Sequence, residues 1–473
     1  VPRGPATGDI TATSAVVWAR ARRAARMFVA LGTNRRLEHA RSRPVGSATA
    51  EQDYTVTARI THLRPNTRYF YRVWFQPPGS PSGPTEAVTG TFRTAPPARR
   101  PSNVRFVFGG DLGSGGYCRH RKHGYPIFYY MTTLRPDFFV ALGDMIYADG
   151  SCREYGPNGW ENLPGRFAEV DEPAVDWTDP AALHELYFEH WRYNRADRHL
   201  QFLLGRTGLY SVWDDHEIVN DSGASWSFWT PATAARPGYR NIVAAGRDAF
   251  LAYGAIGRDD RAPLRLYRSF RWGRDLQLLL LDTRSYRSRN EQRDTPENKK
   301  TMLGAAQLSW LKRQLRGSKA TWKVIASSVS LTVPNGSAAS GRDGWADGGS
   351  GNGFERELLD LLRFLDAKNV KNVVFIAADL HFPQVTRSRR DYDGDGDAFV
   401  FHELIAGPLN ARVWAPYGLD ATTNPTQLYA EGNLFSFGYA TVSRRRGPAR
   451  LHVETRDSFG RLRPGSAFEL VAR

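Results

Sequence analysis

Six continuous apolar runs, separated by stretches of helical character, constrain the fold of this chain more than any other feature. Continuous apolar strands that alternate with helices are typical of an α/β layer with a buried sheet. We therefore predict an α/β region of layered β-sheets flanked by helices, in which strands at 402–405, 438–442 and 450–454 close a second sheet against the first. The apolar runs lie at 104–108, 138–142, 209–213, 276–281, 322–328 and 373–377, and the helical stretches include 126–134, 181–204, 305–315 and 354–365.

The first 97 residues have a different pattern. Short alternating segments, separated by Pro, Gly and Asn, predict a small all-β sandwich, and the stretch 63–73 is similar to the tyrosine-bearing strand entry of fibronectin type III-like modules. A proline-rich, basic stretch at 95–101 indicates a linker. We place the sandwich at 1–97, the linker at 98–102 and the α/β region at 103–473.

The 473 residues carry a net charge of +16, with 41% hydrophobic and 24% charged residues. This composition allows a large buried core, and the positive charge attracts polyanions such as nucleic acid, anionic lipid or phosphorylated substrates. The alternative is that the charge keeps a secreted protein soluble.

No run approaches the roughly 20 apolar residues that span a bilayer, and residues 1–10 lack the apolar region of a signal peptide. We expect a mature form that is secreted, periplasmic or associated with the cell wall.

The chain has two cysteines, Cys118 and Cys152. They follow two acidic strand ends, described next, by similar distances, so they can come close in space. We expect a disulfide that ties two loops together, which implies an oxidising compartment. Two free thiols are the alternative, and spacing alone does not decide between them.

Four short runs place acidic, Tyr or His side chains where predicted strands end. In an open α/β sheet, ligands bind outside the carboxyl ends of the strands. One Asp alone at such a position is usually a helix N-cap or a turn residue, but four carboxylates together repel unless they are protonated or neutralised by cations. The pattern predicts a two-metal hydrolytic site. The runs are Gly109-Gly110-Asp111, Gly143-Asp144-Met145-Ile146-Tyr147, Trp213-Asp214-Asp215-His216-Glu217 and Ala378-Asp379-Leu380-His381.

These runs, the stretch Leu281-Asp282-Thr283-Arg284-Ser285-Tyr286-Arg287 and the preceding sandwich together resemble the alkaline phosphatase D (PhoD-like) family of metallophosphoesterases. That family is related to the purple acid phosphatases and to PhoD-like phospholipase D. The resemblance extends from about residue 4 to the end of the chain. Two positions depart from it: Asp111 stands where many members carry Cys, and Ala378 stands where Gly is usual.

The resemblance implies a ligand set. Asp144 would bridge two metals, with Asp111, Tyr147 and His381 completing the first site and Asp215 and Asp379 the second. A phenolate with carboxylates and an imidazole suits Fe³⁺, and a site of carboxylate oxygens suits Ca²⁺ best, with Mn²⁺, Mg²⁺ or Zn²⁺ as alternatives. Cys118 is an alternative ligand of the first metal.

The resemblance also implies a mechanism, in which a metal-activated water attacks phosphorus. His216, next to Asp215, would stabilise the developing charge or protonate the leaving oxygen; the alternative is that His216 only orients Asp215. Arg284 and Arg287 would clamp the phosphate. Alternatively, Asp282, Thr283 and Arg284 hold a turn together.

Two further segments have an open role. Asp391, Asp393, Asp395 and Asp397 begin like an EF-hand loop, but position twelve is His402 instead of Glu. We predict a structural calcium there, and an acidic hairpin tip is the alternative. The aromatic segment 226–229 would wall the leaving-group pocket or contact lipid, unless it only packs a long loop.

We therefore expect a monomeric, secreted, bimetallic phosphodiesterase or alkaline phosphatase that acts on phosphate monoesters or diesters. Phospholipids and cell-wall polymers are candidate substrates, and an anionic surface is a candidate peripheral contact. Alternatives are phospholipase D-type hydrolysis, a nuclease, and a catalytically inactive surface-binding protein. The sequence has no nucleic-acid recognition motif, so we expect no specific nucleic acid partner.

Overall fold

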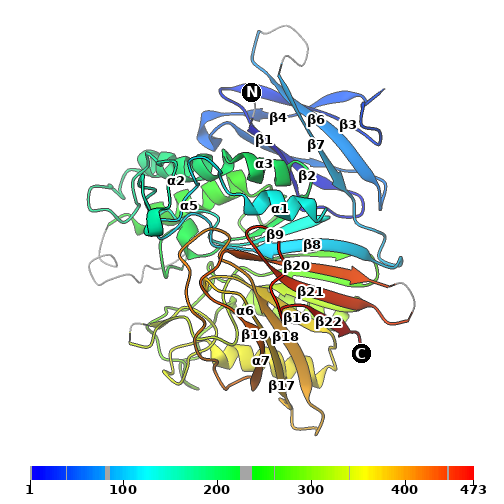
Figure 1. The fold of residues 1–473 in the computed structure, drawn as a ribbon, viewed down its shortest axis with the longest axis vertical. Helices are drawn as coiled ribbons and strands as arrows, with labels where there is room; N and C mark the ends of the chain where they lie inside the picture. The colour runs from blue at the N-terminus through cyan, green and yellow to red at the C-terminus, as the bar shows by residue number, and fades with distance from the viewer. Residues whose placement is uncertain are drawn as a thin grey trace.

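The structure is a computed structural model that describes residues 3–38, 40–79, 86–223, 237–259, 261–339, 341–444 and 447–473. Two large β-sheets pack face to face, and helices cover their outer faces (Figure 1). The predicted α/β architecture of layered sheets and helices is confirmed. Among the described helices, none combines the length and apolar character needed to cross a membrane.

The first sheet has nine strands in the order β22-β21-β20-β8-β9-β10-β1-β2-β5. Its centre is the parallel set β8, β9 and β10, whose apolar residues are buried on both faces. Within the described part of the chain, four helices pack on the outer face of this sheet. The central strands and helices are β8 (Asn103–Gly109), β9 (Phe138–Leu142), β10 (Gly208–Val212), α1 (Ile127–Thr133), α2 (Pro180–Arg195), α3 (Arg198–Leu204) and α5 (Tyr239–Tyr253).

The second sheet has seven strands in the order β11-β12-β13-β16-β18-β17-β19. Strands β12, β13, β16 and β18 are parallel; helices connect β12 to β13 and β13 to β16, and strand β17 connects β16 to β18. Two of the described helices pack on its outer face. The elements are β11 (Arg268–Trp272), β12 (Leu276–Leu280), β13 (Trp322–Ala326), β16 (Val373–Ala377), β17 (Gln384–Arg390), β18 (Phe399–Ile405), β19 (Pro425–Ala430), α6 (Gly304–Gly317) and α7 (Glu355–Ala367); the hairpin β14 (Gly336–Ser337) and β15 (Gly341–Arg342) lies apart.

Aromatic side chains fill the space between the sheets. The rings of Phe138 and Trp272 have centroids 5.0 Å apart, and the Trp272 indole donates to the Tyr210 hydroxyl at 2.8 Å. All three residues are buried. The two sheets therefore share one core, and the carboxyl ends of their parallel strands are held in a fixed relation.

Two predictions about local structure are wrong. The segments 438–442 and 450–454 form β20 (Ser436–Ser443) and β21 (Arg450–Asp457), which extend the first sheet beside β8, followed by β22 (Phe468–Val471). An alternating pattern reports burial but not which sheet supplies the partner strand. The predicted helix 181–204 is broken, because the Asp197 carboxylate caps α3 by accepting the backbone N–H groups of His199 and Leu200 at 2.9 Å.

The N-terminal region is the predicted β-sandwich. The Tyr69 hydroxyl accepts the backbone N–H of Arg64 at 2.8 Å, a contact like the tyrosine corner of such sandwiches. Strand β1 also pairs in parallel with β10, so one layer of the sandwich continues the nine-stranded sheet. The layers are β1 (Arg3–Gly8), β2 (Ala15–Arg20) and β5 (Thr55–Ile60), facing β3 (Ala25–Gly32), β4 (Ser42–Ala48), β6 (Arg68–Gln76) and β7 (Ala87–Arg93).

Candidate metal centre

Sharp turns at the carboxyl ends of strands position the predicted ligands. Asp111, Asp144 and Asp379 each lie two residues after a strand, namely β8, β9 and β16. Their φ angles are 65°, 52° and 73°, and that of His381 is 58°. Positive φ is uncommon for residues other than glycine, and Asp and His are among those that adopt it most readily. The backbone turns back at each strand end, which brings four side chains from two sheets to one place.

Asp111, Tyr147 and His381 form one group. The Tyr147 hydroxyl lies 2.9 Å from His381 Nε2, and this nitrogen is 3.9 Å from Asp111 Oδ1. His381 Nδ1 is hydrogen-bonded to the backbone carbonyl of Arg412. Because a carbonyl only accepts, Nδ1 carries the proton, and the Nε2 lone pair accepts the Tyr147 hydroxyl proton.

Asp144, Asp215 and His216 form a second group, with one ligand atom of each within 4.8 Å of the others. Asp215 begins the 3-10 helix η3 (Asp215–Glu217), and the His216 backbone N–H donates to Asp144 Oδ1 at 3.2 Å. Asp379 lies beside the first group, because its backbone N–H donates to Asp111 Oδ1 at 3.2 Å, and the rings of Tyr147 and His216, with centroids 4.1 Å apart, connect the two groups. The predicted metal ligands thus converge.

The carboxylates of Asp111 and Asp144 are buried, and Oδ2 of each has no hydrogen-bond partner. Burial, followed by neighbouring charges that include other carboxylates, raises the pKa of Asp111, Asp144 and Asp379 well above the ordinary range. A buried, unsatisfied carboxylate oxygen is costly unless a cation binds it. The donor set of this site therefore fits bound metal ions.

Comparisons with known proteins agree with this geometry. A family model described as PhoD-like phosphatase matches residues 115–458, and one described as PhoD-like phosphatase, N-terminal domain, matches residues 1–96. The chain belongs to the PhoD-like phosphatase family. Its similarity to the sequence of alkaline phosphatase D from Bacillus subtilis (strain 168) is 25% identity over 408 residues, which are 81% of this chain and 62% of that protein. The chain thus spans about three fifths of the length of this relative.

Two solved structures share the fold. A structure of PhoD superimposes with a TM-score of 0.73 at 20% identity, covering 99% of this chain and 88% of that one. The purple acid phosphatase PPD1 from yellow lupin (Lupinus luteus) seeds superimposes with a TM-score of 0.63 at 14% identity, covering 100% and 74%. Both superpositions span the sandwich and the two large sheets of this PhoD-like phosphatase.

Glu217, which is not among the ligands predicted above, holds the site of this PhoD-like phosphatase together. Its fully buried carboxylate accepts the backbone N–H groups of Asp144 at 2.9 Å, Met145 at 2.8 Å and Asp214 at 2.8 Å. One side chain thereby fixes the loops that follow β9 and β10. Its position in the Trp213–Glu217 run, beside Asp215 and His216, is the sequence feature that could have identified it as a site residue.

Asp149 is a second residue that the prediction missed. Its carboxylate accepts His216 Nδ1–H at 2.6 Å and the backbone N–H of Asn220 at 2.8 Å. Burial alone would lower the pKa of His216, but Asp149, Asp144 and Asp215 outweigh it and raise that pKa well above the ordinary range. Asp149 lies two residues after Tyr147 and therefore just outside the Gly143–Tyr147 run.

Arg284 and Arg287 are buried beneath the site. Arg284 donates to both carboxylate oxygens of Asp343, at 2.8 and 2.6 Å, and its Nε donates to Asp214. Asp282 Oδ1 accepts the backbone N–H of Arg284 at 3.2 Å, and Arg287 donates to the Asp343 carbonyl. These contacts favour the alternative in which Arg284 holds the loops together.

Asn335 and Asp343 come from the long connection between β13 and α7. The Asn335 amide donates to Asp379 Oδ2 at 2.6 Å. The connection has no periodic pattern, so neither residue had a sequence signal that placed it at the site.

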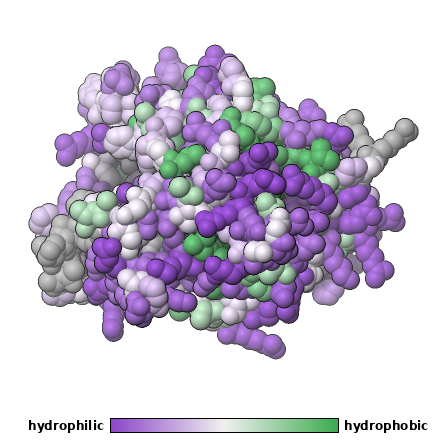
Figure 2. Space-filling model, turned by 90° about the horizontal axis from the view of Figure 1, so that it is seen from below, coloured by the Kyte–Doolittle hydropathy of each residue, from purple (hydrophilic) through white to green (hydrophobic). Residues whose placement is uncertain are grey.

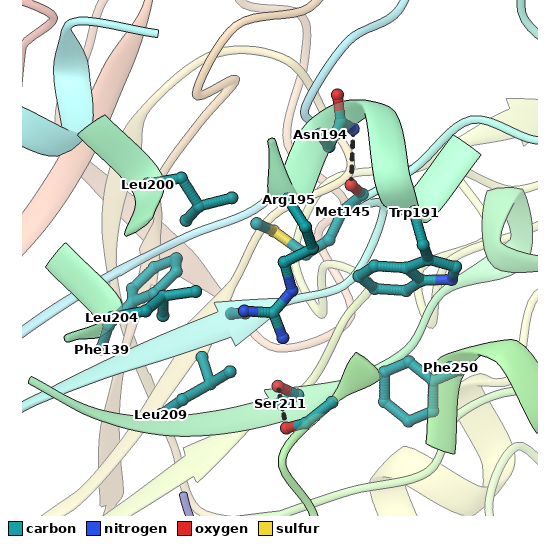
Figure 3. Close-up of a pocket in the computed structure, with 12 residues that line it drawn as sticks. Phe139, Met145, Trp191, Asn194, Arg195, Leu200, Leu204, Leu209, Ser211 and Phe250 are labelled. Carbon is teal, nitrogen blue, oxygen red and sulfur yellow. Dashed lines mark hydrogen bonds between the residues drawn. The ribbon is translucent and has the colours of Figure 1, made fainter. Parts of the chain in front are cut away.

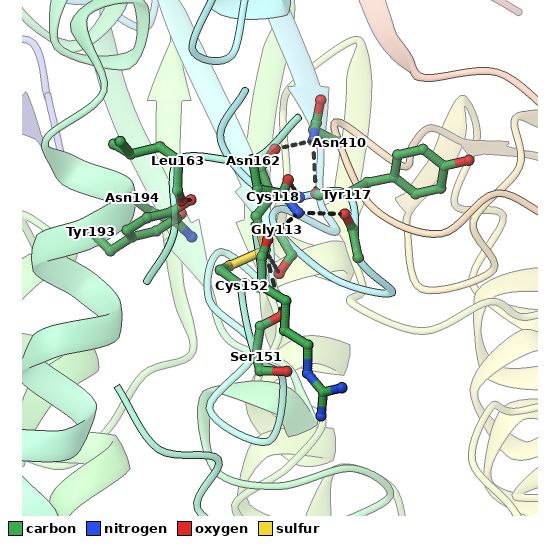
Figure 4. Close-up of a disulfide and its surroundings, with 12 residues drawn as sticks. Gly113, Tyr117, Cys118, Ser151, Cys152, Asn162, Leu163, Tyr193, Asn194 and Asn410 are labelled. Atoms are coloured by element: carbon green, nitrogen blue, oxygen red, sulfur yellow. Dashed lines mark hydrogen bonds between the residues drawn. A yellow bond between two sulfur atoms is a disulfide. The ribbon is translucent and has the colours of Figure 1, made fainter. Parts of the chain in front are cut away.

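The disulfide prediction is confirmed. Cys118 and Cys152 are joined, with their Cα atoms 5.7 Å apart (Figure 4). The bond links the loop after Asp111 to the loop after Asp144, and Asn162 Oδ1 accepts the Cys118 backbone N–H at 2.9 Å. Because its sulfur is in the disulfide, Cys118 offers no thiolate to a metal.

The acidic segment 391–397 forms an exposed turn between β17 and β18. The Asp391 carboxylate accepts the backbone N–H groups of Gly394 at 2.6 Å and Gly396 at 3.0 Å. Carboxylate oxygens of Asp366, Asp391 and Asp393 lie within 4.8 Å of one another. The structural calcium stays a prediction. The aromatic segment 226–229 lies outside the described residues.

A separate small cavity lies between helices α2 and α3 and the first sheet (Figure 3). Its volume is about 20 Å³, and its lining includes Phe139, Leu204 and Leu209. Arg195 reaches into it and donates to the Tyr253 carbonyl. No carboxylate lines this cavity, so it is no candidate for a metal.

Proposed function

We propose that this PhoD-like phosphatase is a secreted, bimetallic hydrolase of phosphate esters, with diesters preferred. The observation that carries the proposal is the pair of buried oxygens without partners, Asp111 Oδ2 and Asp144 Oδ2, at the junction of the two ligand groups. Bound cations would supply Lewis-acid chemistry and a water of lowered pKa. Residues proposed to hold an Fe³⁺ are Asp111, Asp144, Tyr147 and His381, and those proposed to hold a second ion, Ca²⁺ by preference, are Asp144, Asp215 and Asp379.

His381 and Tyr147 support iron as the first ion. Burial lowers the pKa of His381 to about 4, so the imidazole is neutral at physiological pH, with Nδ1–H held by the Arg412 carbonyl. Burial and nearby carboxylates raise the pKa of the Tyr147 phenol well above its ordinary value. Its phenolate therefore requires a strongly charged cation beside it.

His216 is the proposed proton donor to the leaving oxygen. The Asp149 carboxylate fixes Nδ1–H, so Nε2–H is the proton that His216 has available for transfer. The raised pKa of His216 keeps the imidazolium form populated in the absence of metal. Arg284 acts indirectly in this proposal, since its contacts with Asp214 and Asp343 hold the loop that carries Asp215 and His216.

Location and substrate class follow from charge and from the disulfide. The disulfide supports an oxidising compartment, and the net charge of +16 favours anionic substrates. The face seen from below is mostly hydrophilic, with small and separate apolar patches (Figure 2). On this evidence we favour polar phosphodiesters over phospholipids as substrates.

Turnover of bis-p-nitrophenyl phosphate tests the proposal. The metal-loaded protein should cleave it, and Asp144→Asn should abolish cleavage while the matched change at an exposed position, Asp393→Asn, leaves it intact. A protein that retains its metal but cleaves neither monoester nor diester would instead support a catalytically inactive surface-binding protein.

A further inference from the structure

Aromatic residues of α3, α1 and the turn after β21 form a continuous row on the surface, which we name the aromatic strip. The Phe202 and Tyr129 rings are stacked, with centroids 6.2 Å apart. Tyr130 meets Tyr129 edge-on at 5.4 Å and Phe459 edge-on at 6.0 Å. Phe459 is 52% exposed, Tyr129 45% and Phe202 37%. The strip therefore presents aromatic surface from three adjacent elements to the solvent.

The strip ends at a pocket between the sandwich and the α/β region, beside the packed helices α1 and α3 (Figure 1). The volume of this pocket is about 590 Å³. Its lining has four exposed arginines and no Asp or Glu, and none of the four forms an ion pair with a described residue. We name it the arginine pocket, after Arg35, Arg68, Arg135 and Arg206.

Arg206 belongs to both features. Its guanidinium lies 3.7 Å from the centre of the Phe202 ring and donates to the Phe202 carbonyl at 3.2 Å. Burial and the neighbouring charge of Arg35 lower the pKa of Arg206. Positive charges that are close together, with no carboxylate between them, repel one another, and a bound anion relieves this repulsion. The pocket is therefore complementary to negative charge.

Both features lie apart from the metal centre. Arg135 directly precedes the segment that enters β9, and Arg206 precedes β10, so the arginine pocket is at the amino ends of these parallel strands. Asp144 and Asp215 follow the carboxyl ends of the same two strands. A ligand in the arginine pocket is therefore not the ester that the metal centre would cleave.

The arrangement of the rings favours a lipid partner over a nucleic acid. Bases stack on free ring faces, but Arg206 covers Phe202, and Arg461 lies 4.9 Å from the centre of the Phe459 ring. The edge-on contacts of Tyr130 also turn its neighbours out of a common plane. Exposed aromatic side chains beside arginines are typical of surfaces that lie in the headgroup region of a bilayer.

We propose that the aromatic strip and the arginine pocket dock this protein on an anionic lipid membrane. Phe202, Tyr129 and Phe459 would enter the interface, and the guanidinium groups of the pocket would bind headgroup phosphates. The contact is peripheral, and it goes beyond the proposed function because it requires no cleavage of the lipid.

Co-sedimentation of the full, metal-loaded chain with vesicles tests the proposal. The protein should bind vesicles of equal parts phosphatidylcholine and phosphatidylglycerol more tightly than phosphatidylcholine alone, and added salt should weaken this binding. Phe459→Ser should lower the partition coefficient on the anionic vesicles about fivefold, since less apolar surface leaves water. Arg206→Gln should also lower it about fivefold. Hydrolysis of soluble bis-p-nitrophenyl phosphate should stay unchanged in both variants.

Matched controls lie elsewhere on the surface. Tyr155 is 66% exposed and outside the strip, and Arg316 is an exposed arginine of α6. Tyr155→Ser and Arg316→Gln should each change the partition coefficient less than about twofold. Melting temperatures of all four variants should match the wild type, because each side chain is exposed.

Three outcomes overturn the proposal. Equal binding to the two kinds of vesicle, or to neither, would show that the arginine pocket does not bind anionic headgroups. Losses in the control variants as large as those in Phe459→Ser and Arg206→Gln would assign the binding to overall charge. Binding of single-stranded DNA that Arg206→Gln weakens, without vesicle binding, would assign the surface to a nucleic acid. Failure to cleave bis-p-nitrophenyl phosphate would refute the proposed function alone, since vesicle binding is measured without turnover.

Discussion

The buried carboxylates at the two-sheet junction and the exposed carboxylates of the 391–397 turn have the same chemistry and opposite surroundings. Asp111 and Asp144 are each 1% exposed, and one oxygen of each lacks a partner. Asp391 is exposed, and both of its oxygens accept backbone N–H groups of its own turn. Hydrogen bonds to these N–H groups lower the pKa of Asp391, whereas burial raises the pKa of Asp111 and Asp144.

This difference indicates where a cation is required. Water and backbone donors stabilise charge at the exposed turn, so its fold does not depend on an ion. At the junction, the negative charges are removed from water and repel one another, which only protons or cations relieve. The predictions below change one kind of carboxylate at a time.

The largest expected effect comes from Asp144→Asn. Loss of the proposed bridging ligand should lower kcat/KM for bis-p-nitrophenyl phosphate about 10³-fold or more, because several kcal/mol of transition-state stabilisation depend on the metal pair. Steady-state kinetics measure the loss. Asp393→Asn should stay within about twofold of wild type. Equal losses in the two variants would remove the distinction between the junction and the turn.

Asp149→Asn should have the next largest effect, about 10²-fold on kcat, because His216 loses the carboxylate that fixes its tautomer and orientation. The loss should be greater for a diester with an alkyl leaving group than for one with p-nitrophenolate, since only the poor leaving group needs a proton. Parallel kcat measurements on the two esters check this. A loss of the same size on both would show that Asp149 only maintains structure.

Asp53 provides a third kind of carboxylate, buried but fully paired. It binds Arg20 at 2.6 Å and Arg192 at 2.9 Å, which links the sandwich to α2. Asp53→Asn should lower the free energy of unfolding by about 3 kcal/mol at pH 7, since Arg20 loses its carboxylate partner and Arg192 loses the buried one of its two. Glu185→Gln removes the exposed partner of the same Arg192 and should cost at most about 1 kcal/mol. Urea unfolding measures both, and equal costs would contradict the role of burial.

The effect of Asp53→Asn should also depend on pH. Burial alone would raise the pKa of Asp53, but hydrogen bonds from Arg20, Arg192 and Tyr253 hold it below the ordinary value. The stabilisation is therefore complete above the unfolded pKa of about 3.9 and is lost as pH falls through the lower folded pKa. Wild type and variant should converge in stability at acidic pH. A difference that persists undiminished there would exclude an ionic cause.

The smallest effect is expected at the exposed turn. Without calcium, Asp391→Asn should change the free energy of unfolding less than any of the variants above, because the amide oxygen still accepts one backbone N–H. Thermal unfolding with and without added calcium checks this value. A large calcium-dependent stabilisation that Asp391→Asn removes would show that the turn, too, is a cation site.

Residues whose positions follow from the local sequence pattern could be predicted. Asp111, Asp144, Asp215 and Asp379 were accessible because apolar strands are easy to find and their carboxyl ends share one edge of a sheet. Asn335 and Asp343 were not, because they lie in an irregular connection whose path depends on tertiary packing. For the same reason the sheet partner of the segment 438–442 was assigned incorrectly: its alternation is the same beside either sheet.

Elemental analysis with a visible spectrum, on wild-type protein and on Asp144→Asn, tests the central claim most directly. We predict about two metal ions per chain in the wild type, one of them iron with a tyrosinate-to-iron absorption band from Tyr147, and loss of both the band and the second ion in Asp144→Asn. A folded Asp144→Asn variant that keeps the full metal content and the same spectrum would contradict the account.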